Sequence, residues 1–370
     1  MKYIWQYKNW DQFTWDSEKI LPILGQVRLR QGELLTKVKT LGLASIHQAQ
    51  AEILIEETIK TAAIEGEIFN VNSVRSSVAR QLGLSFAGTK PIDRHVDGLV
   101  EILLDATKHY EKPLSAQQLK LWQSALFPTG FSGLHKIRVG QWRGKEPMQI
   151  VSGAIGREKI HFEAPPEDRI ESEMKLFFKW WKDSQGVTEG FLRAAIAHFW
   201  FVVIHPFEDG NGRIARALTD MALAQDEKNS VRFYSLSSQI MEEREAYYCV
   251  LEKCSKGSGD ITLWLLWFLE SLLHSMEKSE HLIRKILAKA HFWHQHSEKD
   301  FNVRQRKIVN RLLDSGQGEF IGGLTTRKYV ALTKVSRATA FREISDLVGK
   351  KVLVQTSTQG RNVSYDLNWE

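Results

Sequence analysis

A segment of twelve residues near the middle of the chain, residues 205–216, brings together a histidine, a carboxylate, two glycines and two arginines. The imidazole of His205 has an unperturbed pKa near ~6.5 and is a natural proton acceptor at neutral pH. Asp209 offers the hard oxygen ligand that a Mg²⁺ ion bridging phosphates requires. Arg213 and Arg216 are three residues apart, so on a helix they share a face and are able to clamp two phosphates. The segment therefore has the groups for proton transfer beside a bound polyphosphate.

The flanking elements must hold this segment as a turn followed by a helix. The apolar, helix-like stretch from Thr188 to Ile204 ends at His205-Pro206, because proline disfavours helical geometry in the residue before it. The glycines of Gly210-Asn211-Gly212 tolerate positive φ, which lets successive backbone N–H groups converge on one point. The helix that starts at Arg213 directs its unpaired N–H groups and its positive dipole end to the same point. We expect an anion to bind there.

This segment resembles the signature of the Fic family, His-x-Phe-x-Asp/Glu-Gly-Asn-Gly-Arg-x-x-Arg, without any departure. The resemblance implies a mainly α fold, a Fic helical core with a small β-hairpin flap, and transfer of AMP from ATP to a hydroxyl of a target protein. It also implies that His205 is the base that deprotonates this hydroxyl and that Asp209 binds Mg²⁺. The residues implied to bind the phosphates of ATP are Gly210, Asn211 and Gly212, with Arg213 at the β-phosphate and Arg216 at the γ-phosphate.

A second resemblance lies upstream, where Thr61-Ala62-Ala63-Ile64-Glu65-Gly66 is similar to the inhibitory motif that many Fic proteins carry on a helix. In the family this glutamate pairs with the second arginine of the signature, here Arg216, and occupies the place of the γ-phosphate. A carboxylate–arginine bond in a partly desolvated site is strong enough to compete with a phosphate. The resemblance therefore implies autoinhibition by Glu65, on a long helix expected from Gln48 to Glu67.

Two strand-like runs, 148–151 and 159–162, are separated by Ser152-Gly153-Ala154-Ile155-Gly156 and predict a hairpin. The hairpin resembles the flap that Fic enzymes place beside the nucleotide. Its edge is able to hold an extended target segment by strand addition and to present a Ser, Thr or Tyr hydroxyl to His205. We expect a target protein to dock at residues 148–162. The enzyme itself is a further possible target, and a homodimer is possible.

Tyr247 and Tyr248 resemble the paired tyrosines that lie near the adenine in the family. Family members often have an asparagine seven residues after the second tyrosine, where this chain has Ser255. Ser255 is thus the position near the expected adenine site where this chain departs from the family pattern.

Composition indicates a multidomain soluble protein. The chain has 370 residues and 43% apolar content, which is enough for two or three ordinary cores. No run approaches the ~18 apolar residues of a membrane span, and the first residues lack a long apolar signal region. We therefore expect no membrane association and a cytoplasmic location. Cys249 and Cys254 lie five apart in a helical context, which suits neither a disulfide framework nor a zinc site.

The last seventy residues form a separate basic module. Residues 301–370 hold twelve Lys or Arg against six Asp or Glu, which accounts for the whole net charge of +6. The pattern predicts helices at 302–313, 326–332 and 336–348, then strands at 351–356 and 362–367 joined at Gln359-Gly360, in the order of a winged helix-turn-helix. The basic residues that are able to touch phosphates are Arg337, Arg342, Lys350, Lys351 and Arg361. DNA is a possible partner of 301–370, and protein docking or packing is the alternative.

The sequence thus predicts three parts: a helical N-terminal domain with the inhibitory helix (1–95), a Fic catalytic domain (96–285) and a winged-helix domain (300–370). The spacing of Trp5, Trp10 and Trp15 matches no amphipathic period and favours an aromatic cap or short helices in the first part. The expected function is that of a protein adenylyltransferase (AMPylator) with ATP and Mg²⁺. The alternatives are removal of AMP, use of another nucleotide donor, or a DNA-binding regulator whose Fic core senses a nucleotide. Retention of His205 favours the enzyme, because sensing ATP needs no base.

Overall fold

The computed structural model describes residues 2–39, 42–84, 93–152, 159–316, 318, 320–356 and 363–369. It divides into two compact units, one of residues 1–40 and 47–279 and one of residues 41–46 and 280–370. The fold is mainly helical, as the sequence predicts, and each of its three small sheets is a two-stranded antiparallel hairpin. The division into three domains at 95 and near 285–300 stays a prediction.

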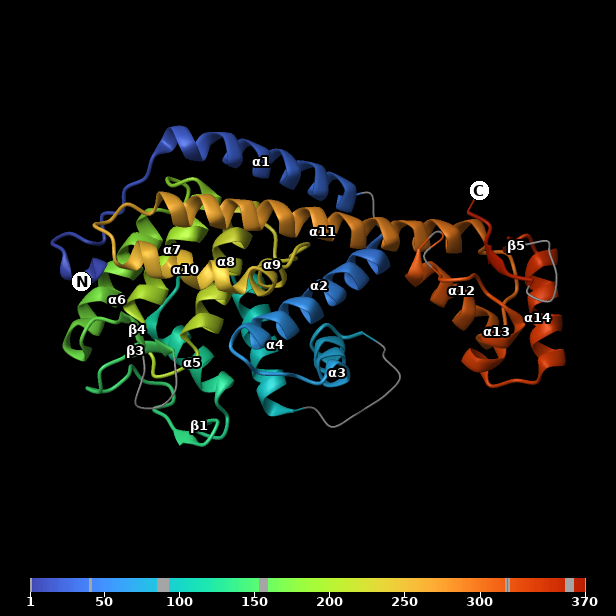
Figure 1. Cartoon of the computed structure of the whole chain (residues 1–370), viewed down its shortest axis with the longest axis horizontal. Helices are drawn as coiled ribbons and strands as arrows, with labels where there is room; N and C mark the ends of the chain where they lie inside the picture. Colours follow the sequence, from blue (N-terminus) through green and yellow to red (C-terminus); the bar gives the residue numbers. More distant parts are fainter. Residues whose placement is uncertain are drawn as a thin grey trace. The chain divides into compact units, whose positions relative to one another are not determined.

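The first unit is a helical assembly with two hairpins (Figure 1). Its elements in chain order are η1 (Ile4–Gln6), α1 (Ser17–Lys39), α2 (Leu43–Ile64), α3 (Val71–Gln81), α4 (Arg94–Lys108), α5 (Ala116–Leu126), β1 (Phe131–Ser132), β2 (His135–Lys136), β3 (Gln149–Ser152), β4 (Lys159–Glu163), α6 (Glu167–Asp183), α7 (Gly190–Ile204), α8 (Asn211–Glu227), α9 (Leu236–Glu242), α10 (Arg244–Ser255) and α11 (Thr262–Gln295). Residues 43–46 of α2 and 280–295 of α11 belong to the second unit.

The core of this unit is built around α7 and α8, which pack against each other (Figure 1). Every residue of α7 except Val202 is buried, and α8 is buried from Arg213 to Ala224. An all-round apolar helix such as α7 has no solvent-facing stripe and is stable only inside a core. The turn between α7 and α8 carries the segment 205–210, so two of the most buried helices fix its two ends.

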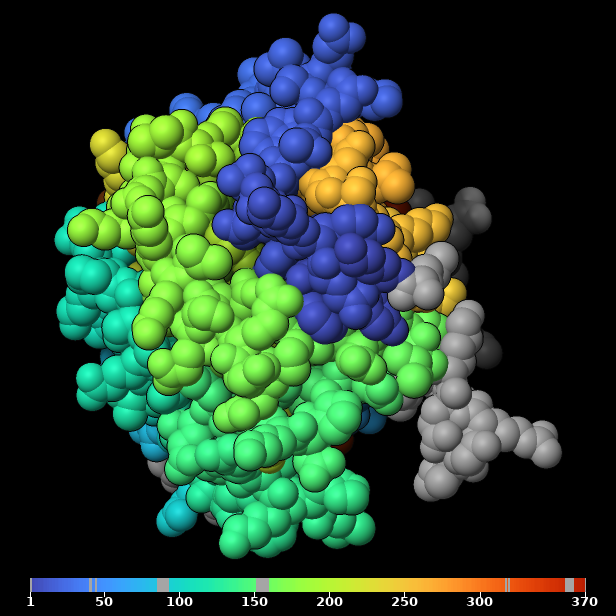
Figure 2. All heavy atoms as spheres, turned by 90° about the vertical axis from the view of Figure 1, so that its left-hand side faces the viewer, coloured from blue at the N-terminus to red at the C-terminus, as the bar shows by residue number. Residues whose placement is uncertain are grey.

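The N-terminal residues cover one side of this core. Figure 2 shows them in dark blue between the green segment that contains α6 and α7 and the orange start of α11. Trp5 Nε1 donates to the carbonyl of Glu163 at 2.7 Å, and the buried Trp10 Nε1 donates to Glu173 Oε2 at 3.2 Å. These contacts fit the expected aromatic cap. The element that follows, α1, is a helix of 23 residues rather than a short one.

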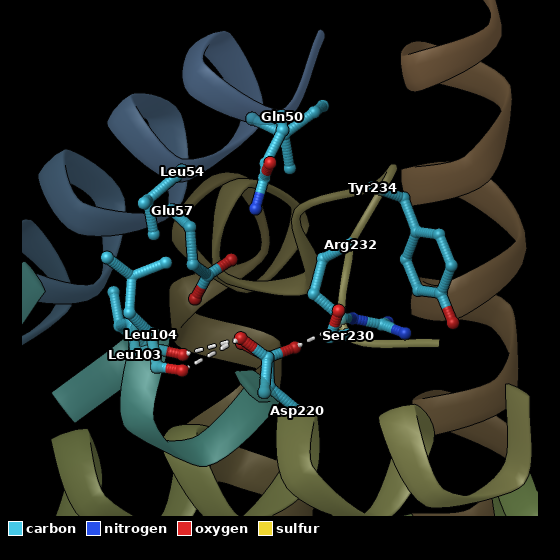
Figure 3. A pocket seen from close by; sticks show the side chains of 11 residues that line it. Gln50, Leu54, Glu57, Leu103, Leu104, Asp220, Ser230, Arg232 and Tyr234 are labelled. Carbon is cyan, nitrogen blue, oxygen red and sulfur yellow. Dashed lines mark hydrogen bonds and ion pairs between the residues drawn. The ribbon is translucent and has the colours of Figure 1, made fainter. Parts of the chain in front are cut away.

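A buried polar cluster lies between α2, α4, α8 and residues 230–234 and lines a cavity of about 30 Å³ (Figure 3). Arg232 pairs there with Glu227 at 2.6 Å and with Asp220 at 3.4 Å. Burial and the nearby charge of Glu57 raise the pKa of Asp220 to about 8. Asp220 therefore keeps its proton to a higher pH than an ordinary aspartate.

The second unit has its own core. Its remaining elements are α12 (Val303–Ser315), α13 (Thr326–Thr333), α14 (Arg337–Gly349), β5 (Leu353–Gln355) and β6 (Tyr365–Leu367). Their order confirms the three helices and the hairpin expected from the sequence. The expected turn at Gln359-Gly360, together with Arg361, lies outside the described residues. None of the helices in the described ranges combines the length and the apolar composition needed to cross a bilayer.

Candidate active site

The turn between α7 and α8 begins at His205, which has left-handed backbone angles of φ 50° and ψ 58° and so ends α7, as Pro206 predicts. The side chain of Asn211 fastens the turn from within. Its Oδ1 accepts from the N–H of Phe207 at 3.0 Å, and its Nδ2 donates to the carbonyl of Phe207 at 2.8 Å. The buried Arg143 adds a tertiary bond from its Nε to the carbonyl of His205 at 2.8 Å. Because its side chain closes the turn, Asn211 is held in place with its backbone N–H at the start of α8.

The imidazole of His205 is oriented by its own helix. Its Nδ1 lies 3.1 Å from the carbonyl oxygen of Val202, which accepts a hydrogen bond and so fixes the proton on Nδ1. Nε2 is then the nitrogen with a free lone pair. Burial lowers the pKa of His205 and the charge of Arg143 adds to this effect, while the bond to Val202 and the carboxylates of Glu65 and Asp209 oppose it. His205 is therefore neutral at neutral pH and able to accept a proton.

The start of α8 presents backbone N–H groups to the same place. Gly210 precedes the helix with φ 90°, and no side chain of the described residues caps the first turn. The first N–H groups of a helix have no intrahelical partner, so here they remain available to an anion. A Cβ added to Gly210 would meet the side chains of Leu126 and Phe127 at 3.0 Å. Glycine is thus required at 210 by both its backbone angles and its packing.

Arg213 and Arg216 follow on the first turns of α8, and both guanidiniums are in ion pairs. Arg213 is 3% exposed and donates from Nη1 to Glu67 Oε1 at 2.8 Å. Arg216 is 2% exposed and donates from Nη2 to Glu65 Oε1 at 2.8 Å. Among the described residues, Nε of Arg213 and Nη1 of Arg216 are buried without a hydrogen-bond partner. Two buried cationic donors without acceptors fit phosphate oxygens as their missing partners.

Glu65 lies directly after the end of α2 and faces the start of α8. Arg216 holds this segment further through Nη2 to the carbonyl of Thr61 at 3.0 Å and through Nε to the Thr61 hydroxyl. Arg244 of α10 donates from Nε to the carbonyl of Ile64 at 2.8 Å. Burial of Glu65 raises its pKa, but the charge of Arg216, its hydrogen bond to the carboxylate and the charge of Arg213 outweigh burial and hold the pKa below its usual value. Glu65 is therefore an ionised side chain in this site.

Gly212 explains how Glu65 comes so close to α8. A Cβ added at this position would lie 2.1 Å from Glu65 Oε1 and 3.3 Å from Arg216 Nη1. A Cβ at 2.1 Å from a carboxylate oxygen would be a severe steric clash. The missing side chain of Gly212 thus leaves the space that Glu65 fills.

Asp209 is placed at the mouth of the turn. Its Oδ2 accepts from the hydroxyl of Ser132, and its Oδ1 accepts from the N–H of Gly210 at 2.5 Å and lies 3.6 Å from Arg213 Nη2. The described residues contain no cluster of three or more His, Cys, Asp or Glu side chains able to hold a metal ion. A single carboxylate holds Mg²⁺ only together with phosphate oxygens and water, which is the usual arrangement for Mg²⁺ on nucleotides. Asp209 is thus the carboxylate that this turn offers to a cation.

A cavity of about 680 Å³ opens beside these groups and brings together many of the expected site residues. Its wall includes Glu65, His205, Gly212, Tyr247 and Tyr248. This volume lies in the range of small-molecule sites. His205 and the start of α8 thus face the same space.

The two tyrosines have different surroundings. The buried Tyr247 hydroxyl bonds with Nε2 of the buried His198 at 2.9 Å, so it is committed to the core. Tyr248 stacks edge to face with Tyr247 at 5.0 Å and lies under the guanidinium of Arg244 at 5.0 Å. Ser255 lines the cavity, with its hydroxyl donating to the carbonyl of Glu252 at 3.0 Å.

The expected flap hairpin is present at one side of the cavity. β3 and β4 pair antiparallel with an irregularity between Ile150 and Val151, and Ile150, His161 and Phe162 line the cavity. His161 Nδ1 lies 2.7 Å from Glu252 Oε2 of α10. Residues 153–158, which include most of the expected turn, lie outside the described residues.

Several site residues were missed by sequence reasoning. They are Glu67, which pairs with Arg213; Ser132, which bonds Asp209; Arg143, which holds His205; and Arg244, which holds the end of α2. Thr61 was noticed only as part of a motif, although its hydroxyl and carbonyl both accept from Arg216. Only Glu67 had a local signal, since it lies two residues after Glu65.

Comparison with known proteins agrees with this geometry. The sequence profile of the Fic/DOC family matches residues 113–223, and that of a "Domain of unknown function (DUF4172)" matches residues 3–84. The chain is 40% identical over 201 residues to protein adenylyltransferase fic-1 of Caenorhabditis elegans, which covers 53% of this chain and 36% of that protein. It is 22% identical over 289 residues to protein adenylyltransferase Fic of Drosophila erecta, covering 74% and 53%.

A third relative is the probable protein adenylyltransferase aq_aa38 of Aquifex aeolicus, 30% identical over 99 residues, which covers 26% of this chain and 31% of that protein. The chain thus spans between about a third and about half of the length of these curated relatives.

Solved structures show the same fold at low identity. A Fic family protein from Desulfovibrio desulfuricans G20 superposes with a TM-score of 0.55 at 17% identity and covers 98% of both chains. A Fic domain containing signaling protein from Bacteroides thetaiotaomicron VPI-5482 superposes with a TM-score of 0.54 at 19% identity, covering 70% of this chain and 96% of that one. The complete signature at 205–216 lies inside the matched profile, so residues 113–223 of this chain contain a Fic/DOC family domain.

Proposed function

We propose that this protein is an adenylyltransferase that transfers AMP from ATP to a hydroxyl side chain of a target protein. The observation that carries the proposal is that His205, whose Nδ1 is bonded to the carbonyl of Val202, lines the same cavity as Gly212 at the start of α8. A base and an anion-binding helix end that face one space are the two parts that nucleotidyl transfer needs. The names of the curated relatives support the same reaction.

The proposed reaction is a single displacement at the α-phosphorus of ATP. Nε2 of His205 takes the proton of the target hydroxyl, and the oxygen forms a bond to the α-phosphorus of ATP. The bond from the α-phosphorus to the oxygen of the β-phosphate breaks, and pyrophosphate leaves. The N–H groups at the start of α8 stabilise the negative charge on the phosphates, with Arg213 and Arg216 as the proposed partners of the β- and γ-phosphates. Mg²⁺ bound to the phosphates and Asp209 would add positive charge at the leaving group.

Autoinhibition by Glu65 is part of the proposal. Arg216 cannot give its Nη2 to a γ-phosphate while Glu65 occupies it at 2.8 Å. The additional bonds from Arg216 to Thr61 and from Arg244 to Ile64 hold the same segment in place. These contacts support a resting state in which ATP binds weakly or with its α-phosphate misaligned.

Target docking is proposed at the flap, residues 148–162, where a strand of the target would add to the hairpin. Ile150 and Phe162 line the cavity that contains His205. A hydroxyl held by the flap would therefore enter the same space as the base.

The decisive experiment uses ATP labelled at the α- or the γ-phosphate, incubated with lysate proteins and with wild type, Glu65→Gly or His205→Ala protein. AMP transfer gives label only from the α-position, more label with Glu65→Gly and none with His205→Ala. Absence of α-label with Glu65→Gly, or undiminished label with His205→Ala, would refute the proposal.

Two further experiments test for other reactions at the same site, namely transfer from another nucleotide and removal of AMP. α-Labelled GTP, CTP and UTP test donor choice, which Ser255 leaves open. Labelled products incubated with wild-type protein without ATP test whether the same site also removes AMP.

A further inference from the structure

The second unit carries a helix-turn-helix with a hairpin beside it. α13 ends at Lys334 with φ 60°, and Ser336 starts α14 by accepting from the N–H of Thr339 at 3.2 Å. Leu324, just before α13, is joined to Tyr365 of β6 by two backbone bonds of 2.7 and 2.8 Å. Buried side chains from all of these elements, among them Tyr329, Ile344 and Leu367, form one core. The helices and the hairpin thus form one rigid scaffold.

Acidic side chains in this unit are neutralised by neighbours. Glu343 accepts from Arg304 Nε at 3.0 Å and from the Tyr329 hydroxyl at 2.7 Å. Asp346 pairs with Lys350 at 2.7 Å, and Asp314 pairs with Lys289 at 2.7 Å. These three carboxylates therefore contribute little free negative charge to the surface.

Three exposed arginines of the helix-turn-helix have no such partners among the described residues. Within the described part of the chain, no ion pair or side-chain hydrogen bond involves Arg327 of α13 or Arg337 and Arg342 of α14, and all three are exposed. The pairing of the carboxylates thus leaves a cationic face on α13 and α14.

A groove of about 1130 Å³ lies on this face. The residues along it come from the starts of α13 and α14 and from β6, and they include Thr325, Thr326, Arg327, Lys328, Arg337, Phe341 and Tyr365. Among the described residues no carboxylate lines it. The starts of both helices add the positive ends of their dipoles. Every charged side chain of the described residues that lines the groove is therefore positive.

We propose that this groove binds duplex DNA, with α14 in the major groove. An α14 of 13 residues is about 20 Å long, and an α-helix fits the major groove, which is about 12 Å wide. Arg337, Phe341 and Ser345 are spaced by four residues, so they share one exposed face. Phe341 is 62% exposed, and an aromatic ring at this place suits contact with thymine methyl groups. The arginines suit the phosphates on either side.

A flexible acidic peptide is the competing occupant. The cations that line the groove come from two helices, Arg327 and Lys328 from α13 and Arg337 from α14. Duplex DNA presents phosphates on both sides of an inserted helix, and this geometry matches the cations of α13 and α14. The proposal is independent of adenylyl transfer, because none of its residues belongs to the site around His205.

The test titrates a fluorescein-labelled duplex of 25 base pairs, with a randomised sequence, with the full-length protein. Fluorescence anisotropy of the duplex measures binding at 50 and 200 mM KCl. The groove variant is Arg327→Ala/Arg337→Ala. The matched control is Arg284→Ala/Arg311→Ala, which removes two exposed arginines of the same unit that have no partner among the described residues and do not line the groove. Circular dichroism verifies that both variants are folded.

We expect wild-type affinity to fall at least about tenfold between the two salt concentrations. At 50 mM KCl the groove variant should bind the duplex about tenfold more weakly than the wild type. Its slope of log affinity against log salt concentration should be smaller in magnitude by about two, whereas the affinity of the control variant should change less than about threefold. His205→Ala should bind DNA like the wild type. No binding at 50 mM KCl, or equal losses in the two double variants, would overturn the proposal. Displacement of the duplex by poly-glutamate at equal charge concentration would also overturn it, in favour of an acidic protein segment.

Discussion

The carboxylate of Glu65 and the guanidinium of Arg216 are joined at 2.8 Å although 151 residues separate them in the chain. The pair closes the place where Arg216 would meet a phosphate. It also lies beside Gly212, whose missing Cβ makes room for the carboxylate. One contact thus links the helix α2 to the anion-binding end of α8.

Replacement of Glu65 by glycine is expected to raise AMP transfer by about tenfold or more. The loss of a charge-assisted bond worth roughly 1.5–3 kcal/mol frees Arg216 for the γ-phosphate. Self-labelling with α-labelled ATP measures the effect. Arg216→Ala serves as the control and should not activate, because it removes the phosphate ligand together with the partner of Glu65. Unchanged labelling in Glu65→Gly, with His205→Ala inactive, would mean that the enzyme lacks this brake.

The acid limb of the pH profile of kcat/KM is expected to have its midpoint below 6.5, the ordinary pKa of histidine. Burial lowers the pKa of His205, so the neutral base survives to lower pH and is lost only as pH falls through this lowered value. Because Glu65 raises this pKa, Glu65→Gly should move the limb to still lower pH. Initial rates between pH 4.5 and 8 measure the acid limb of the wild type and of Glu65→Gly. A midpoint above 6.5, or a shift to higher pH in the variant, would contradict the assignment.

Asp209→Ala is expected to weaken nucleotide binding in the presence of Mg²⁺ and to abolish its sensitivity to a chelator. A water molecule is a poor substitute for a carboxylate ligand of Mg²⁺. Calorimetric titration of ATP with Mg²⁺ or with EDTA, in the Glu65→Gly background, reports binding without turnover. Glu208→Ala is the matched control, since it removes the adjacent carboxylate. Equal binding by the Asp209 variant and this control would exclude the proposed role.

Asp220→Asn is expected to increase stability at pH 8 more than at pH 5. The pKa of Asp220 is raised from 3.8 to about 8 by burial and by Glu57 (Figure 3), so the folded state retains a proton that the unfolded state releases. The stabilisation is complete below the unfolded pKa and is lost as pH rises through about 8. Asparagine is neutral throughout and removes this loss. Urea unfolding at pH 5, 7 and 8.5 gives the free energy of unfolding as a function of pH. Glu101→Gln, which removes an exposed carboxylate, is the control. The same pH dependence for wild type and Asp220→Asn would disprove the assignment.

Thr61→Val is expected to lower the free energy of unfolding by about 1–3 kcal/mol, because the variant leaves Arg216 Nε buried without an acceptor. Thr36→Val removes a comparable hydroxyl from an exposed helix position and should cost much less. Urea denaturation of the two variants gives the comparison. Equal losses would show that the bond between Thr61 and Arg216 contributes little.

The sequence by itself determined the local geometry of the site. Pro206 predicts the end of α7 at His205, and the run Gly210-Asn211-Gly212 predicts the turn and the start of α8. Both features depend on backbone angles and on bonds within four residues, such as those between Asn211 and Phe207. Short-range conformational preference is written in residue type, which is why these elements were predictable. The helices and strands of the second unit were recognisable for the same reason.

The tertiary structure alone decided which partners the site residues have. Sequence reasoning treated Arg213 and Arg216 as a free clamp, whereas both are ion-paired, to Glu67 and Glu65. Resemblance to a family suggested the pair with Glu65, but nothing near Asp209 or His205 in the chain points to Ser132 or Arg143. Trp5 and Trp10 precede α1 and bond to Glu163 and Glu173, so the interval of five residues between them reflects tertiary contacts and not the face of one helix. Such contacts depend on how buried helices pack together, and packing depends on the whole core rather than on any short stretch of sequence.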